Sequence, residues 1–186
     1  MNIAGIDTAV TAMRNGGVIA YPTEAVFGLG CDPDNHAALA ALLALKQRPA
    51  SKGLILIAAE LTQLLPYIAE VDAALQQRAL DTWPGPVTWL FPCAKHIDPL
   101  LRGEHQTIAV RVTAHPLARQ LCLALGKAIV STSANLSGHA PARTVVEVQA
   151  QFSDRLAAIV AGQVDLGAKP SEIRDLVSNK IIRSGA

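Results

Sequence analysis

The sequence predicts an α/β (α+β) protein with one open, twisted, mixed sheet flanked by helices. Short apolar runs that suit buried strands alternate with longer runs of helical spacing, and glycine or proline separates them. Elements that alternate in this way bury a sheet under helices. The 186 residues are 51% hydrophobic and 17% charged, which supplies a core for a single domain spanning residues 1–186.

The first half of the chain shows this alternation clearly. Apolar residues with helical spacing between residues 9 and 13 predict a first helix, which Gly16-Gly17 ends. An alanine- and leucine-rich helix ends near Lys46, and Pro49 supplies a stop signal just beyond it. The elements expected in this half are a strand at residues 18–21, a helix at 36–45 and a strand at 54–57.

The second half repeats the pattern with strong helix-start signals. Pro116 opens a helix that reaches residue 125, because proline is favoured in the first turn. Thr144 and Glu147 form a capping box for a later helix. The other expected elements are a helix at 71–80, a Trp-Pro-Gly-Pro corner at 83–86, strands at 87–91, 107–112, 128–130, 157–160 and 180–182, and a polar loop at 131–138.

Composition excludes several classes of protein. The formal net charge of +1 provides no global attraction for nucleic acid. No stretch approaches eighteen uninterrupted apolar residues and the N-terminus lacks a signal-like pattern, so we expect a cytoplasmic protein with no membrane segment. Wide cysteine spacing favours reduced thiols over a disulfide framework or a zinc site. The cysteines are Cys31, Cys93 and Cys122.

The familiar nucleotide and hydrolase motifs are also missing. The sequence has no GxxxxGK[ST] phosphate loop, and Gly28-Leu29-Gly30 lacks the third glycine of a dinucleotide fingerprint. The histidines show no HExxH spacing, and no Gly-x-Ser-x-Gly elbow is present. The sequence therefore predicts no protein-held metal and gives no support to a serine hydrolase.

Cations and hydroxyl or amide residues recur near the ends of the expected elements, a pattern that favours phosphate-handling chemistry. Thr23, Arg111 and Ser131 lie near the C-terminal ends of expected strands, which predicts that they meet in one cleft. Each segment also has an ordinary explanation, because residues 46–52 could complement a helix dipole and residues 131–138 could form a flexible turn. The candidates are Lys46, Arg48, Lys52, Arg111 and Arg183, with Thr23, Thr107, Ser131, Ser133, Asn135 and Ser171.

Five segments resemble the YrdC/TsaC family, in the same order and over nearly the whole chain. The first is long and specific, although Ala25 replaces the usual threonine and Phe27 the usual tyrosine. The second and fourth form the family's KxR…SxN signature. The segments are Tyr21-Pro22-Thr23-Glu24 with Phe27-Gly28-Leu29-Gly30, Lys46-Gln47-Arg48-Pro49 with Lys52, Arg111-Val112, Ser133-Ala134-Asn135, and Pro170-Ser171 with Ile182-Arg183-Ser184-Gly185.

The resemblance implies a single YrdC-like domain with a concave basic cleft and a nucleotidyltransferase activity. Such an enzyme forms L-threonylcarbamoyl-AMP and pyrophosphate from L-threonine, bicarbonate or CO2, and ATP. Mg²⁺ would accompany the ATP, and no organic cofactor is implied. The product would serve N6-threonylcarbamoyladenosine (t6A) modification of tRNA beside the anticodon, with a separate t6A transferase complex as the acceptor.

The resemblance also implies roles for individual residues. Lys46 and Arg48 would be catalytic, and Arg111 would bind the carboxylate of threonine through the planar fork of its guanidinium. The expected ATP-binding residues are Lys46, Arg48, Lys52, Thr107, Ser133, Asn135 and Arg183. The expected threonine-binding residues are Thr23, Arg111, Ser131 and Ser171.

Two departures from the family pattern affect the details. Ile57 stands near a strand end where members often carry a polar residue. Longer members have a C-terminal extension whose linker can cover the site, so this chain would correspond to the catalytic domain alone. We expect the polar segment 170–186 to cover the site instead, as a mobile lid.

Two alternative functions are weighed against the synthase. A non-catalytic module could bind double-stranded RNA or tRNA on the same basic surface. However, 4% aromatic residues and a near-neutral charge predict only weak, salt-sensitive binding. The fold could also serve another carbamoyl adenylation, but the acylphosphatase and zinc-type segments of such larger proteins are missing.

Overall fold

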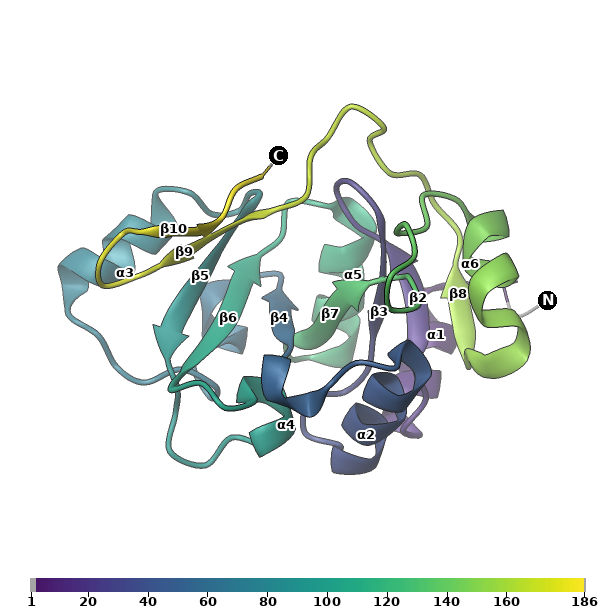
Figure 1. The fold of residues 1–186 in the computed structure, drawn as a ribbon, viewed down its shortest axis with the longest axis horizontal. Helices are drawn as coiled ribbons and strands as arrows, with labels where there is room; N and C mark the ends of the chain where they lie inside the picture. The colour runs from purple at the N-terminus through teal and green to yellow at the C-terminus, as the bar shows by residue number, and fades with distance from the viewer. Residues whose placement is uncertain (1–2, 186) are drawn as a thin grey trace.

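The computed structural model describes residues 3–185, which fold into a mixed sheet with helices packed on it (Figure 1). The strands are β1 (Ile3–Ala4), β2 (Ile19–Pro22), β3 (Phe27–Gly30), β4 (Ile55–Ala58), β5 (Val87–Pro92), β6 (Thr107–Val112), β7 (Ile129–Ser133), β8 (Ala158–Val160), β9 (Glu172–Asp175) and β10 (Ile181–Arg183). The helices are α1 (Ile6–Arg14), α2 (His36–Lys46), α3 (Ala73–Leu80), α4 (Pro99–Arg102), α5 (Pro116–Leu125) and α6 (Val145–Phe152), with short 3-10 helices at Ala50–Lys52, Leu61–Gln63 and Ser153–Arg155.

Within the described residues the sheet has ten strands in the order β1-β8-β2-β3-β7-β4-β6-β5-β9-β10. The β1–β8, β2–β8, β4–β6 and β5–β9 pairs are parallel, and the others are antiparallel. The fold class expected from the sequence, an open mixed α/β sheet, is therefore confirmed.

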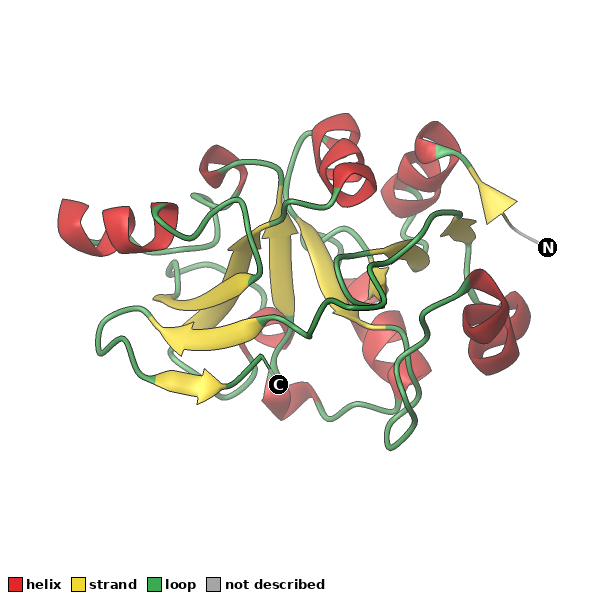
Figure 2. Cartoon of the chain, turned by 90° about the horizontal axis from the view of Figure 1, so that it is seen from above, coloured by secondary structure: helices red, strands yellow, loops and turns green. Residues whose placement is uncertain are grey.

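The two faces of the sheet bury separate hydrophobic clusters, because successive side chains of a strand point to opposite faces. In β2, Ile19 and Tyr21 pack with α1 and α5, whereas Ala20 belongs to the cluster that also contains α2 and α6 residues. In β4, Ile57 belongs to the cluster with α1 and α5, and Leu56 belongs to the cluster with α2 and α6. Figure 2 shows helices on both sides of the sheet.

Most predicted helices and strands are confirmed, but β1, β3, α4, β9 and the three short 3-10 helices were missed. The loop expected at 131–138 is wrong in its first three residues, because β7 continues to Ser133 and pairs with β3 and β4. Ser131 and Ser133 are therefore held by a strand and not by a flexible turn.

The C-terminal segment is more regular than its composition suggested. From Pro170 to Gly185 it adds β9 and β10 to the end of the sheet, with β9 parallel to β5 (Figure 1). Arg78 donates hydrogen bonds to the carbonyls of Leu176 and Val177, which ties this hairpin to α3. The strand expected at residues 180–182 is confirmed as β10, β9 was not expected, and Ala186 lies outside the described residues. Along the part of the chain that the structure describes, no helix has the length and apolar character needed to span a membrane.

Candidate active site

A pocket of about 390 Å³ opens between the β2–β3 turn, the middle of the sheet and the C-terminal segment. Four cationic side chains line it, so the expected concave basic cleft is present. Seven of the eleven residues predicted from the sequence contribute to its walls. They are Thr23, Arg48, Arg111, Ser131, Ser133, Ser171 and Arg183.

The other four predicted residues are not part of the pocket wall. Lys46 is buried at the end of α2, and Asn135 is half-buried just beyond β7. Lys52 is exposed in the short 3-10 helix, and Thr107 begins β6. The structure therefore brings the threonine set together completely and the ATP set in part.

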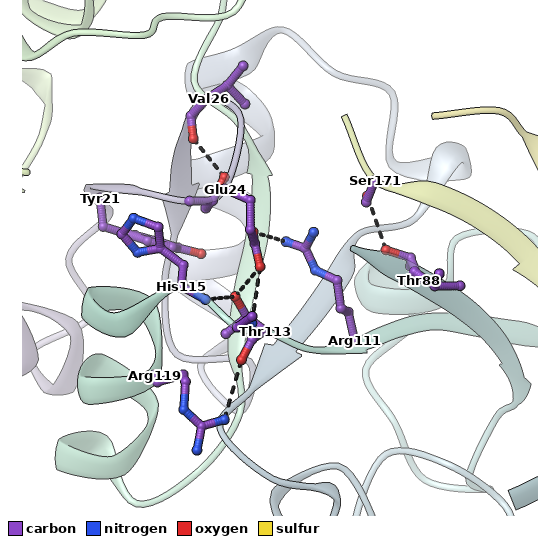
Figure 3. Close-up of polar contacts among 12 residues, drawn as sticks. Tyr21, Glu24, Val26, Thr88, Arg111, Thr113, His115, Arg119 and Ser171 are labelled. Carbon is purple, nitrogen blue, oxygen red and sulfur yellow. Dashed lines mark hydrogen bonds and ion pairs between the residues drawn. The ribbon is translucent and has the colours of Figure 1, made fainter. Parts of the chain in front are cut away.

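Arg111 is the most buried cation of the pocket, with 7% of the residue exposed. Its Nη2 lies 3.3 Å from Oε2 of Glu24. Oε1 of the same carboxylate accepts a hydrogen bond from the Thr113 hydroxyl at 2.6 Å (Figure 3). It accepts a second from the Ala114 N–H at 3.2 Å. Although burial alone would raise the pKa of Glu24, Arg111 and the hydrogen bond from Thr113 hold it below its usual value. Glu24 is therefore an ionised partner of Arg111.

The glycines of β3 make room for this site. A Cβ on Gly28 would lie 3.3 Å from Cγ2 of Thr23 and 3.4 Å from Oγ of Ser131. A Cβ on Gly30 would lie only 2.3 Å from the Val130 carbonyl oxygen, closer than any side chain allows. The Gly-Leu-Gly pattern therefore serves close strand packing beside the pocket, in agreement with the missing dinucleotide fingerprint.

The Lys46 ammonium holds the chain segment that carries Ser133 and Asn135. It donates hydrogen bonds to the carbonyls of Ser133 at 2.5 Å and Asn135 at 2.8 Å, with a longer contact of 3.4 Å to Oδ1 of Asn135. The Ser133 hydroxyl donates to the same Oδ1 at 2.6 Å. Burial and the neighbouring Arg48 lower the pKa of Lys46 to about 8. Lys46 thus fixes the position of Ser133 in the wall.

The C-terminal hairpin supplies the opposite wall through Ser171 and Arg183. Nη2 of Arg183 donates to the Ser171 carbonyl at 2.8 Å and approaches the Ser171 hydroxyl at 3.3 Å. The fully buried Thr88 of β5 donates to the same hydroxyl at 3.2 Å (Figure 3). Arg183 is exposed as a whole residue, but partial desolvation of its guanidinium and the nearby charges of Arg111 and Arg48 lower its pKa. The three guanidinium groups therefore lie close enough to repel one another.

The way in which the strands gather these residues differs from the sequence expectation. Thr23 follows β2 and Ser131 lies in β7, and these two strands run in the same direction because each is antiparallel to β3. Arg111 lies in β6, which is parallel to β4 and therefore antiparallel to β7. The sequence predicted that Thr23, Arg111 and Ser131 meet because C-terminal strand ends lie at one edge of the sheet. That explanation does not hold, because the long Arg111 side chain reaches the pocket from a strand that runs in the opposite direction.

Three residues around the pocket were given no role by sequence reasoning. Glu24 follows directly after Thr23 in a specific motif, so a signal for it was present. Lys169 lies in an exposed loop where no pattern marks it. Thr88 gave no signal because a threonine inside a strand is ordinary β-sheet composition.

Within the described residues, no group of three or more His, Cys, Asp or Glu side chains could hold a metal ion.

The fold and this pocket define an α/β protein with an anion-binding cleft, and comparison with known proteins places it in a family. The sequence model of the Sua5/YciO/YrdC family, described as "Telomere recombination", matches residues 11–185. The chain belongs to the Sua5/YciO/YrdC family.

Similar proteins agree with this placement. A protein of Photobacterium profundum is 53% identical over 182 residues, which cover 97% of this chain and 98% of that protein. A protein of Serratia proteamaculans is 54% identical over 178 residues, which cover 95% and 94%. Both are named threonylcarbamoyl-AMP synthase.

Solved structures support the same fold. P. abyssi Sua5 complexed with L-threonine is 30% identical with a TM-score of 0.85, and the match covers 91% of this chain. This chain spans 50% of that longer protein. E. coli YciO is 29% identical with a TM-score of 0.83, and the match covers 96% of this chain and 88% of YciO.

Proposed function

We propose that this chain is a threonylcarbamoyl-AMP synthase, a nucleotidyltransferase that joins L-threonine, bicarbonate or CO2, and the adenylyl group of ATP. Relatives at about half identity over nearly full length carry this name, and a similar Sua5 structure contains L-threonine. The observation that carries the proposal is the pocket itself. A buried, ion-paired Arg111 lies there in the electrostatic field of Arg48 and Arg183, which suits a carboxylate beside phosphates.

The proposed reaction forms two bonds in sequence. The deprotonated amine of threonine adds to CO2 and forms a carbamate, with release of a proton. A carbamate oxygen then attacks the α-phosphorus of ATP. As the new P–O bond forms, the bond from the α-phosphorus to the bridging oxygen breaks, and its electron pair leaves with pyrophosphate. The protein contributes chiefly by positioning the reactants and stabilising charge.

The described contacts support a division of roles. Arg111 would hold the threonine carboxylate, with Thr23, Ser131 and Ser171 around it. Arg48 and Arg183 would face the phosphates, with Ser133 beside them. Lys46 and Asn135 would act by holding the Ser133 segment. For Lys52 and Thr107, the proposed contact with ATP rests on the family resemblance.

Mg²⁺ is proposed to arrive with ATP. Glu24 is the single carboxylate among the described pocket residues, and it is engaged by Arg111, Thr113 and Ala114. This donor set fits an ion held by substrate phosphates and water, as Mg²⁺ commonly is, better than a protein cage. Bound in that way, Mg²⁺ would offset part of the charge that develops on the pyrophosphate.

The C-terminal segment is proposed to cover the site. Lys169, Pro170, Ser171, Arg183 and Ser184 already line the pocket, which supports a role of this segment in enclosing the reactants. Removal of residues 171–186 is expected to abolish synthesis, because Ser171 and Arg183 go with it. Full activity of the truncated chain would contradict a covering role.

The wider setting follows from the proposed product. Threonylcarbamoyl-AMP would pass to a t6A transferase complex, and supply of this intermediate for tRNA modification supports a cytoplasmic location. The non-catalytic RNA-binding alternative is not favoured, because the similar proteins are named as synthases. Weak contact with tRNA is a further proposal that an electrophoretic shift assay would test.

The test of the function is an omission experiment. Purified protein is incubated with ATP, Mg²⁺, bicarbonate and L-threonine, and the nucleotides are resolved by mass spectrometry. A threonylcarbamoyl adenylate that requires ATP, bicarbonate and threonine is expected. Absence of this adenylate, from folded protein that binds neither ATP nor threonine, would contradict the proposal.

A further inference from the structure

Positive and negative charges are distributed unevenly in the pocket. Four cationic side chains line it, but Glu24 is the single acidic side chain among the described lining residues. The proposed reaction places two anionic groups here, a triphosphate and an amino-acid carboxylate. A polyanion attracted to all four cations would also occupy the place of the smaller ligand. The position of the Glu24 carboxylate can therefore decide where the triphosphate binds and where the amino acid binds.

Glu24 is fixed on Arg111 and on no other cation of the pocket. Its Oε2 lies 3.3 Å from Nη2 of Arg111, and the hydroxyl of Thr113 donates to Oε1 (Figure 3). The N–H of Ala114 also donates to Oε1. Oε2 of Glu24 and Nε of Arg111 are both buried and, within residues 3–185, have no hydrogen-bond partner. The ion pair thus keeps one unused acceptor and one unused donor beside the pocket.

The other arginines lack such compensation. Arg48 donates to the Gly53 carbonyl at 3.1 Å, and Arg183 donates to the Ser171 carbonyl at 2.8 Å. Neither forms an ion pair with any residue that the structure describes. The pocket therefore has two arginines, Arg48 and Arg183, whose charge no carboxylate compensates, and one place, at Arg111, where positive and negative charge cancel.

We infer that Glu24 is a specificity-determining residue that divides the pocket into a triphosphate part and an amino-acid part. A neutral ion pair offers little net attraction to a polyphosphate, and its carboxylate repels one. A zwitterionic amino acid instead presents both a carboxylate and an ammonium group to the pair. This inference deepens the proposed function and rests on it. Glu24 acts on threonine binding through Arg111 and on phosphate binding by repulsion.

The test measures whether a polyphosphate and threonine exclude each other. L-threonine is titrated into the full chain by calorimetry, with and without inorganic tripolyphosphate at about ten times its own dissociation constant. In the wild type the threonine affinity is expected to change by less than about twofold. In Glu24→Gln, tripolyphosphate reaches Arg111, and competition at this concentration weakens threonine binding by about 11-fold.

Two further variants separate charge from structure. Glu24→Asp keeps the negative charge and is expected to keep threonine and tripolyphosphate compatible, even where threonine affinity falls. Glu60→Gln makes the same chemical change at an exposed glutamate away from the pocket and should behave as the wild type. Thermal unfolding of each variant checks that it is folded.

The outcomes distinguish failure of the inference from failure of the proposed function. A wild type that binds threonine and tripolyphosphate competitively would overturn the inference, even if Glu24→Gln does not fold. A Glu24→Gln protein that binds both ligands independently would overturn it as well, while leaving the synthase proposal intact. A wild type that binds neither threonine nor ATP would overturn the proposed function and the inference with it.

Discussion

Arg111 and Arg183 face the same pocket from two regions of the molecule that hold them differently. Arg111 lies in β6, inside the sheet, is 7% exposed and is paired with Glu24. Arg183 lies in β10, the last strand of the sheet, is exposed and is held by hydrogen bonds to Ser171. One wall is thus fixed by the core, and the other depends on a terminal hairpin that can move at lower cost.

The largest expected effect tests the wall that the core fixes. Arg111→Lys keeps the charge but loses the planar fork that pairs with Glu24 and with a carboxylate. Threonine affinity measured by calorimetry should fall roughly 10- to 150-fold, as expected for a lost charge-assisted hydrogen bond of about 1.5–3 kcal/mol. Arg183→Lys is the matched control and should change threonine affinity less than about twofold. Equal threonine affinity in Arg111→Lys and the wild type would show that the guanidinium of Arg111 does not hold the threonine carboxylate.

A smaller effect is expected at the wall that the hairpin supplies. Arg183→Ala should weaken ATP binding about 5- to 10-fold, because one cation of the phosphate wall is lost. The free energy of unfolding should change by no more than about 0.5 kcal/mol, since the residue is exposed. Lys180→Ala, an exposed cation of the same hairpin outside the pocket, serves as the control. A large loss of stability in Arg183→Ala would show that the hairpin is not separable from the core.

Lys46 is a buried cation like Arg111, but it is held by backbone carbonyls and not by a carboxylate. Its folded-state pKa of about 8 lies below the ordinary lysine value of 10.5, so between these values the unfolded chain binds more protons. The stability contribution of Lys46 therefore rises with pH in that window. Between pH 8 and pH 9 the wild type should gain about 1 kcal/mol relative to Lys46→Met in denaturant unfolding. Parallel pH profiles of the two proteins would contradict this.

The smallest effect concerns the contact between the two regions. Thr88→Val keeps the shape of the side chain but removes the hydroxyl that donates to Ser171. Threonine affinity should fall about two- to fivefold, within the range of one neutral hydrogen bond. Thr88→Ser, which keeps a hydroxyl, should restore most of it. A Thr88→Ser protein as weak as Thr88→Val would point to packing instead.

The sequence predicted the regular elements better than the contacts between them. Helices with strong periodicity or caps, such as those opened by Pro116 and Thr144, were found because their signals are local. β3 was missed because its two glycines have low strand propensity, although close packing with Val130 and Tyr21 requires a glycine at Gly30. β9 was missed because its polar residues gain their strand partner, β5, from a distant part of the chain.

The candidate site was predicted in the same uneven way. Family motifs identified Thr23 and Arg111, but nothing in the spacing showed that Glu24 would meet Arg111. That contact depends on the turn after β2 and on Thr113 beyond β6, which are far apart in sequence. The role of Lys46 at ATP stays a prediction; its ammonium donates hydrogen bonds to the carbonyls of Ser133 and Asn135, which the sequence did not show.

The most direct test of the central claim is the stoichiometry of the reaction. The protein is supplied with carbon-labelled bicarbonate, ATP, Mg²⁺ and L-threonine, and labelled adenylate and pyrophosphate are quantified together. The account predicts one labelled threonylcarbamoyl adenylate for each pyrophosphate, with neither formed when threonine is omitted. Pyrophosphate or phosphate released at the same rate without threonine, and without labelled adenylate, would contradict it.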